Sequence, residues 1–182
     1  MDKRAQLVRA ASKLAHEQGL ATTTLADIAD EAKVPVGNLY YYFKTKDEIA
    51  EAVVADRLSE FRAFQQGLPV AKSPKERLLA FVETAIDSRT LLAHSGCPVG
   101  NLCSELQKKG GTLARKARSL LGEPLDWIEA QFRSLGKHAD ARGLAVHLVS
   151  ALQGASLLTN VFRDTKIVAM EAERLKQWIR GL

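Results

Sequence analysis

Cys97 is the residue whose setting in the sequence most directly suggests chemistry. Pro98 follows it, and proline is favoured at the first position of a helix, so we expect Cys97 at a helix N-terminus. There the unpaired backbone amides and the helix dipole favour the thiolate, the reactive form of cysteine. One interpretation is therefore a redox or electrophile sensor. The other, and the commoner role of a free cysteine, is a small buried side chain that lines a core or pocket.

Cys103, the second cysteine, follows six residues later. Six residues of intact helix span about 9 Å, which exceeds the roughly 7 Å limit on the Cα separation in a disulfide. A bridge between the two would require the helix to unwind. Two cysteines are also too few for a disulfide framework, which favours a reducing cytoplasmic location.

No metal site or catalytic group is indicated. His94 lies near Cys97, but His16, His138 and His147 fall in separate predicted helices, and no paired CxxC motif exists. No phosphate-binding glycine loop is present, nor a nucleophile, base and acid at a recognisable spacing. The sequence thus predicts no metal, no cofactor and no enzymatic activity.

Residues 22–48 have the pattern of two short helices joined by a tight turn. Thr24 with Asp27 three residues later is a variant of the capping box that starts a helix. Pro35 interrupts this helix, and a second one begins directly after it. Such a pair is typical of a helix-turn-helix, which places its second helix in the major groove of DNA.

The side chains of this segment suit contact with DNA. Gly37 and Asn38 open the second helix, where a missing or short side chain lets the backbone approach base edges and an amide can bridge to them. Three tyrosines follow at positions 40–42. Successive helical residues turn by about 100°, so at least one of the three hydroxyls must be exposed. Thr24 can offer a hydroxyl or a helix N-terminal amide to a phosphate.

Over residues 3–55 the sequence resembles the tetracycline-repressor (TetR) family of transcriptional regulators. The resemblance is carried by Thr24, Ile28-Ala29, Val34, and the run from Val36 to Glu48, which reads VGNLYYYFKTKDE. It implies a three-helix DNA-binding head over residues 1–46 and an effector-binding and dimerisation body over residues 47–182. It also implies a fourth helix that transmits motion between them, and a ligand-responsive regulator, with repression as the family-typical sign.

The resemblance also implies a role for each matching position. Phosphate contacts would come from Thr24, Tyr41 and Lys46, base contacts from Val36, Gly37, Asn38 and Tyr40, and a contact with the DNA backbone from Tyr42. Leu39 and Phe43 would belong to the core. A dimer would read a pseudo-palindromic operator whose half-sites lie about 34 Å or more apart.

Charge alone does not reveal this motif. The chain of 182 residues has a net charge of +5, which suits a polyanionic partner. Yet its first fifty residues carry seven Lys or Arg and seven Asp or Glu. A DNA-binding segment there must distribute its charges over different faces. Charged and apolar residues near the N-terminus interleave as in a helix, which is not the pattern of a signal peptide.

The rest of the chain predicts an all-α protein of about nine helices, because no segment shows sustained period-two alternation. The expected helices cover about residues 3–18, 24–33, 36–43, 46–64, 73–92, 98–107, 112–135, 138–163 and 164–180. Gly122 and Pro124 could interrupt the seventh of them.

Residues 143–162 contain no charge and are numerous enough to cross a bilayer. Six polar residues dilute this stretch, and no second candidate span exists, so we interpret it as a helix buried on two sides. One side would face the core and the other a partner subunit. We therefore expect a partner subunit against the helix at 138–163, with no membrane contact. The TetR resemblance implies a homodimer formed through the helices at 138–163 and 164–180.

Candidate residues of an effector pocket share a residue type and a place in the body. They are aromatic, sulphur-containing or aliphatic residues of the body: Phe61, Phe64, Phe81, Cys97, Cys103, Trp127 and Leu157. Two other classes of protein compete with a regulator. A helical enzyme or redox protein that uses Cys97 predicts thiol-dependent turnover without DNA affinity, and a structural dimeric adaptor predicts neither.

Overall fold

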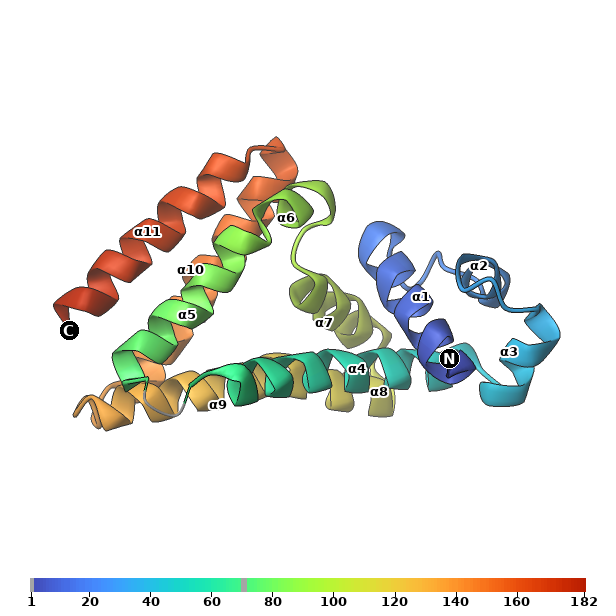
Figure 1. Cartoon of the computed structure of the whole chain (residues 1–182), viewed down its shortest axis with the longest axis horizontal. Coiled ribbons are helices and arrows are strands. Elements are labelled where there is room, and N and C mark those ends of the chain that lie inside the picture. Colours follow the sequence, from blue (N-terminus) through green and yellow to red (C-terminus); the bar gives the residue numbers. More distant parts are fainter. Residues whose placement is uncertain (1, 70–71) are drawn as a thin grey trace. The chain divides into compact units, whose positions relative to one another are not determined.

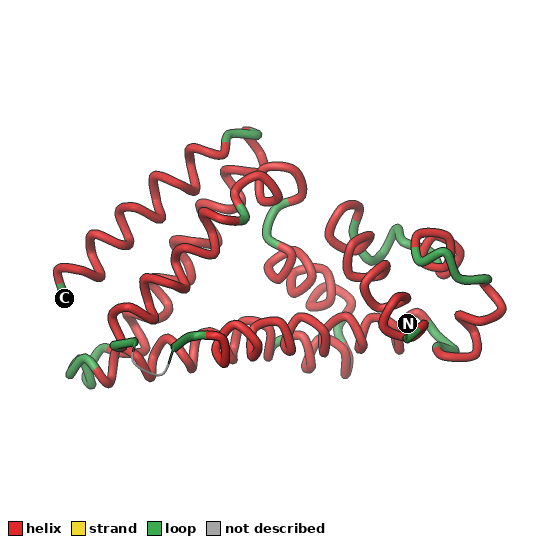
Figure 2. Tube along the Cα trace, in the orientation of Figure 1, coloured by secondary structure: helices red, strands yellow, loops and turns green. Residues whose placement is uncertain are grey.

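The computed structural model describes residues 2–69 and 72–182, and within these residues every regular element is a helix (Figure 2). The all-α prediction is confirmed. The helices are α1 (Lys3–Gln18), α2 (Leu25–Glu31), α3 (Val36–Tyr42), α4 (Lys46–Gly67), α5 (Pro74–Asp87), α6 (Arg89–Ser95), α7 (Pro98–Lys109), α8 (Gly111–Ala117), α9 (Ser119–Ser134), α10 (Ala141–Phe162) and α11 (Thr165–Gly181).

Eleven helices are described where about nine were expected, because two predicted helices are each divided. The helix expected over 73–92 ends at Ser88, whose φ of −88° and ψ of 2° lie outside the helical range, and α6 starts anew. The helix expected over 112–135 is divided at Arg118. Pro124 lies inside α9. Because proline has no N–H, it cannot donate the helical hydrogen bond to the carbonyl of Leu120, which lies in the first turn of this helix. The interruption thus precedes both Gly122 and Pro124.

The chain forms two compact units. Unit 1 comprises the described residues up to Arg62 together with Pro98–Leu121, and unit 2 comprises those within Ala63–Cys97 and Gly122–Leu182. Two helices, α4 and α9, continue from one unit into the other. In unit 1, α7 and α8 pack with the first helices of the chain, although they lie beyond the boundary expected after residue 46. The division of functions at that boundary stays a prediction.

Unit 1 is organised around the apolar faces of its helices. Leu7 on α1, Ile28 on α2, Leu39 on α3 and Ile49 on α4 are fully buried in one cluster. Leu106 on α7 belongs to the same cluster. Since removing a buried leucine or isoleucine side chain costs about 2–5 kcal/mol, this cluster holds α2 and α3 in place.

The turn between α2 and α3 follows from its local hydrogen bonds. The amide of Val34 donates to the carbonyl of Ala29 at 2.9 Å, five residues back, which is the bond that defines a Schellman helix end. Lys33 adopts the left-handed conformation that this motif requires, with φ of 53°. Pro35 then precedes the first residue of α3. The second short helix therefore starts where the sequence predicted.

In unit 2, α11 packs against both α5 and α10, and the three helices run alongside one another (Figure 1). Leu78, Ile128, Phe132, Leu148 and Ile179 are fully buried between them and α9. By length and composition alone α10 could cross a membrane. The core helix of a water-soluble protein passes the same test, and seven residues of α10 are buried in this unit.

Candidate nucleic-acid interface

One face of α3 is exposed and carries the side chains expected to read DNA. Val36 is 46% exposed, Tyr40 48% and Tyr41 77%. Gly37 is exposed between them. Because successive residues turn by about 100°, these four positions share a single side of the helix. The surface that a recognition helix needs is therefore present in unit 1.

The opposite face of α3 anchors the helix to the core. Leu39 is fully buried and Phe43, which directly follows the helix, is 2% exposed, so both are core residues as predicted. The guanidinium of Arg4 on α1 lies 5.1 Å from the centre of the Phe43 ring, within the range of a cation–π contact. The helix α3 is therefore anchored to the core on the side opposite its exposed face.

Asn38 lies beside the edge of this face and Tyr42 nearer the buried side of Leu39, and both are half-buried. The Tyr42 ring packs against the core of unit 1 and meets the Tyr41 ring edge-to-face, with centroids 5.1 Å apart. The three tyrosines thus point in different directions, as helical geometry requires. Tyr40 and Tyr41 are the exposed members.

Packing within the protein does not require a glycine at position 37. No heavy atom lies within 4 Å of the position that a Cβ atom would occupy there. The residue is also helical, so it does not need the left-handed conformation that favours glycine. The missing side chain leaves the backbone open to close approach from outside the protein.

Thr24 and Asp27 form a reciprocal capping box at the start of α2. Oγ1 of Thr24 accepts a hydrogen bond from the amide of Asp27, and the Asp27 carboxylate accepts one from the amide of Thr24. The Thr24 amide and hydroxyl bonds lower the pKa of Asp27, and the charge of Lys46 lowers it further. Thr24 is exposed, which leaves the N-terminus of α2 accessible to a phosphate.

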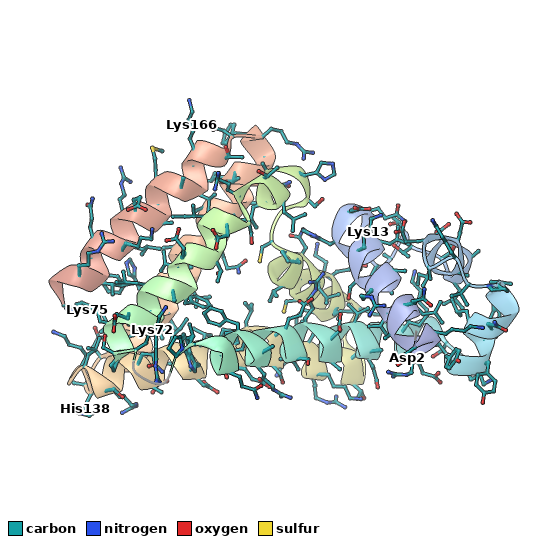
Figure 3. All side chains as sticks on the ribbon, in the orientation of Figure 1. Asp2, Lys13, Lys72, Lys75, His138 and Lys166 are labelled. Carbon is teal, nitrogen blue, oxygen red and sulfur yellow. The ribbon has the colours of Figure 1, made fainter. Side chains whose placement is uncertain are left out.

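Two lysines after α3 bind backbone carbonyls of unit 1. Nζ of Lys44 donates to the carbonyl of Tyr40 at 2.6 Å, which places a positive charge at the C-terminal end of α3. Nζ of Lys46 donates to the carbonyl of Ala21 at 2.7 Å. An ammonium group has three N–H donors, so each lysine can bind a carbonyl and a phosphate at once. On α1, Lys13 (labelled in Figure 3) pairs with Glu31 of α2 at 2.8 Å.

Three of the predicted pocket residues meet in unit 2. The rings of Phe64, Phe81 and Trp127 have centroids 6.0–6.3 Å apart and tilted or edge-on contacts. Phe64 also lines a groove of about 520 Å³, whose other walls are formed mainly by α5 and α11. Charged groups such as Glu83 and Lys176 line this groove as well, so it is not a purely apolar site.

The remaining pocket candidates lie elsewhere. Cys97 directly precedes α7, as predicted, and its Sγ accepts a hydrogen bond of 3.3 Å from Nε2 of Gln153. Cys103 is buried in unit 1 and its thiol lies 3.3 Å from the carbonyl oxygen of Ala117. Phe61 also belongs to unit 1, and Leu157 on α10 is 63% exposed. Neither cysteine forms a disulfide.

Glu105 on α7 makes a contact with the helix-turn-helix segment that the sequence did not reveal. Its carboxylate accepts hydrogen bonds from the backbone amides of Leu20 and Ala21, in the loop before α2. These partners are 85 and 84 residues away in the chain, so no local spacing could have indicated the contact.

The exposed helix-turn-helix lies in a segment whose sequence matches a known protein family. Residues 7–53 match the model of the bacterial regulatory proteins of the tetR family. These residues run from the buried Leu7 of α1 through α2 and α3 to the first turns of α4. Over residues 7–53 the chain belongs to the TetR family of transcriptional regulators. TetR-family proteins are DNA-binding regulators and not enzymes, which removes the competing interpretation as a helical enzyme.

Two relatives that are described as HTH-type transcriptional regulators illustrate the range of similarity. The HTH-type transcriptional repressor KstR2 of Mycolicibacterium smegmatis is 40% identical over 77 residues, which is 42% of this chain and 38% of that protein. A regulator in the lacX 3′ region of Lactococcus lactis is 26% identical over 176 residues, or 94% of this chain and 90% of that protein. Identity is thus highest over a short segment.

A solved structure shows that the fold of the whole chain is that of a TetR regulator. The TetR transcriptional regulator from Legionella pneumophila has a TM-score of 0.87, with 97% of each chain covered. Its sequence is 17% identical, so this likeness concerns the fold alone.

Proposed function

We propose that this TetR-family regulator is a cytoplasmic homodimer that represses transcription from a pseudo-palindromic operator and is released from it by a small-molecule effector. The observation that carries the proposal is the exposed face of α3, where Val36, Gly37, Tyr40 and Tyr41 lie together on a helix anchored by Leu39. Large apolar and aromatic side chains left in water by a well-packed unit indicate a binding surface.

The proposed contacts divide by chemistry. Val36, Gly37, Asn38 and Tyr40 face the base edges in the major groove, because they start the helix or lie on its exposed face. Three further groups bind phosphates and set the register of the protein on the duplex: Thr24, Tyr41 and Lys46. Tyr42, which is half-buried, touches the DNA backbone with its exposed part.

A second copy of the chain would cover the exposed apolar face of the last two helices. The large apolar side chains exposed there are Val146, Leu157, Leu158, Val161 and Phe162 on α10 and Met170 on α11. In a two-fold interface each of them is buried twice. Such a dimer presents two copies of α3, one for each half-site of a palindromic operator. The half-sites of such an operator lie about 34 Å or more apart. The exposure of Leu157 favours this role over a pocket role.

The effector site is proposed in the body, residues 47–182, around the aromatic trio Phe64, Phe81 and Trp127. An effector that binds more tightly to a dimer with altered head spacing shifts the population away from the DNA-binding state. Cys97 offers a second mode of sensing, by electrophiles or oxidants, because it is half-buried at the start of α7. One relative, KstR2, is a repressor, which supports repression of transcription over activation.

Fluorescence anisotropy on DNA from upstream of the protein's own gene, with excess unrelated competitor DNA, tests the proposal. Wild type, Tyr40→Ala and Tyr40→Phe are compared after circular dichroism shows that all are folded. We expect competitor-resistant binding by wild type, its loss in Tyr40→Ala, and an intermediate affinity in Tyr40→Phe if the hydroxyl contributes. Failure of wild type to bind there and in a genome-wide selection would contradict sequence-specific recognition. Equal binding by Tyr40→Ala would remove α3 as the reader.

A further inference from the structure

Glu105 on α7 holds the loop between α1 and α2 by two hydrogen bonds. Its Oε2 accepts from the amide nitrogen of Leu20 at 2.9 Å, and its Oε1 accepts from the amide of Ala21. Hydrogen bonds that an ionised carboxylate accepts are stronger than neutral ones. A single side chain of α7 thereby fixes two consecutive peptide groups of the segment that leads into the helix-turn-helix.

The same loop is bound by a second charged side chain. Nζ of Lys46, the first residue of α4, donates to the carbonyl of Ala21 at 2.7 Å. The N–H and the C=O of Ala21 are therefore both hydrogen-bonded to charged groups, one from α7 and one from α4. We call Glu105, Ala21 and Lys46 the Ala21 clamp.

Ala21, the loop residue of the clamp, lies three residues before Thr24. Hydrogen bonds hold the loop between these two residues. The hydroxyl of Thr22 donates to the carbonyl of Gly19 at 3.0 Å, and that of Thr23 donates to the same carbonyl at 2.8 Å. Thr23 is fully buried. A displacement of Ala21 is consequently passed to Thr24 and to the first turn of α2, and is not absorbed between them.

Two ion pairs also connect α7 and α8 with α4, but they are weaker candidates for holding the loop in place. Lys109 on α7 pairs with Asp47 on α4, and Lys116 on α8 pairs with Glu51 at 2.7 Å. All four side chains are about half exposed, and exposed ion pairs contribute little. Glu105 differs because it is half-buried and binds backbone groups, whose positions define the loop.

We propose that Glu105 is a positioning residue for DNA recognition, which sets the place of Thr24 and of the α2 N-terminus through the Ala21 clamp. The proposal rests on the phosphate contacts proposed above for Thr24 and Lys46. It also gives α7 a role in regulation. This helix begins at Pro98, directly after Cys97, and Glu105 lies about 10 Å along it. A change in the body that moves α7 is transmitted to the DNA-binding loop.

Two variants of the full chain test the role of Glu105. Glu105→Gln keeps the size of the side chain but removes its charge and presents an NH₂ group to an amide donor. Glu17→Gln removes the same charge from an exposed position on α1 and is the matched control. The first measurement is hydrogen exchange of the Leu20 and Ala21 amides without DNA. We expect exchange at least tenfold faster in Glu105→Gln and unchanged in Glu17→Gln.

The second measurement is operator affinity, at a temperature where circular dichroism shows every variant fully folded. We expect a loss of about tenfold in Glu105→Gln, and an equal or slightly higher affinity in Glu17→Gln, because a negative charge near DNA has been removed. A general effect of charge would raise the affinity of both variants, so the opposite signs distinguish positioning from electrostatics.

The outcomes that overturn the proposal are specific. Unprotected Leu20 and Ala21 amides in the wild type would show that the clamp does not form. Faster exchange with operator affinity within twofold of wild type would show that the clamp does not position the reader. If Glu105→Gln does not fold, Glu105→Asp, too short to reach both amides, is judged by the same criteria. Failure of the wild type to bind any DNA would contradict the proposed function instead, and the exchange experiment would still test the clamp.

Discussion

Thr24 and Asp27 bind each other reciprocally across the first turn of α2: the Thr24 hydroxyl accepts from the Asp27 amide at 3.1 Å, and the Asp27 carboxylate accepts from the Thr24 amide at 2.8 Å. The second of these bonds favours the ionised carboxylate and lowers the pKa of Asp27. The start of α2, and with it the proposed phosphate site, is therefore linked to the protonation of one side chain.

Asp27→Asn tests this link through the pH dependence of stability. A carboxyl whose folded pKa is lowered stabilises the fold above its unfolded pKa of about 3.9, and this contribution disappears as the pH falls through the folded value. We expect the variant to unfold at a lower temperature than wild type near pH 6, and the difference to shrink below about pH 4. Thermal unfolding across that range measures it, with Asp30→Asn on the same helix as control. A difference that is constant with pH would contradict the assignment.

Gly37→Ala separates DNA binding from folding. A Cβ at this position meets no atom of the protein, and alanine in a helix is favoured over glycine by roughly 0.5–1 kcal/mol. We expect urea unfolding to show a slightly more stable protein, while operator affinity falls at least tenfold because the methyl group meets the DNA. Gly122→Ala on α9, where a Cβ also meets nothing, is the control and should keep its affinity. Unchanged affinity in Gly37→Ala would contradict close approach of DNA at this residue.

Lys33→Gly should stabilise the turn between α2 and α3. Lys33 adopts φ of 53°, a conformation that costs a residue with a Cβ roughly 1–2 kcal/mol. Glycine removes most of that cost, so we expect a gain of about 1 kcal/mol in the free energy of unfolding, measured in urea. The same change in the interior of a helix, Gln177→Gly on α11, should instead destabilise the protein by about 1 kcal/mol. A loss of stability in both variants would rule out strain at Lys33.

Leu157→Ala tests the proposed dimer. Burying a leucine contributes about 1.5–3 kcal/mol, and two-fold symmetry counts the side chain twice, so the dimer dissociation constant should rise by at least about a hundredfold. Sedimentation velocity over a concentration series measures this shift. Tyr41→Ala removes an even more exposed side chain, an aromatic ring of unit 1, and should leave the association unchanged. A monomeric wild type, or a dimer indifferent to Leu157, would exclude this interface.

The two thiols should differ in reactivity. Cys97 is half-buried, whereas Cys103 is 7% exposed, so iodoacetamide should label Cys97 in the native protein and Cys103 only on unfolding. If Cys97 is a sensor, it reacts faster than a model thiol at neutral pH, and the labelled protein releases its operator. Mass spectrometry of the labelled protein gives both rates. Labelling of Cys97 no faster than the model thiol would leave it a structural residue.

Much of the fold was predictable because it depends on residues close together in the chain. The capping boxes at Thr24 and Ser73 mark the starts of α2 and α5 where the sequence indicated. The TetR resemblance likewise implied that Leu39 and Phe43 are buried. Caps and helical faces arise from contacts within about four residues, which a sequence pattern records directly.

Other features depend on contacts that no local pattern contains. No breaker signal in the sequence marks the boundary of α5 with α6 at Ser88 or that of α8 with α9 at Arg118, and the breaker signals at Gly122 and Pro124 pointed to a different place. The pocket candidates were chosen by residue type alone, and the structure brought only Phe64, Phe81 and Trp127 together.

The sequence by itself determined that the chain is helical, that a helix-turn-helix begins at Thr24, and that at least one of the tyrosines at positions 40–42 is exposed. Only the tertiary structure decided that α7 packs in unit 1 and that Glu105 binds the amides of Leu20 and Ala21. The reason is physical. Several helices have apolar faces that could pack against α1, and the choice among them is made by the combined burial of residues far apart in the chain.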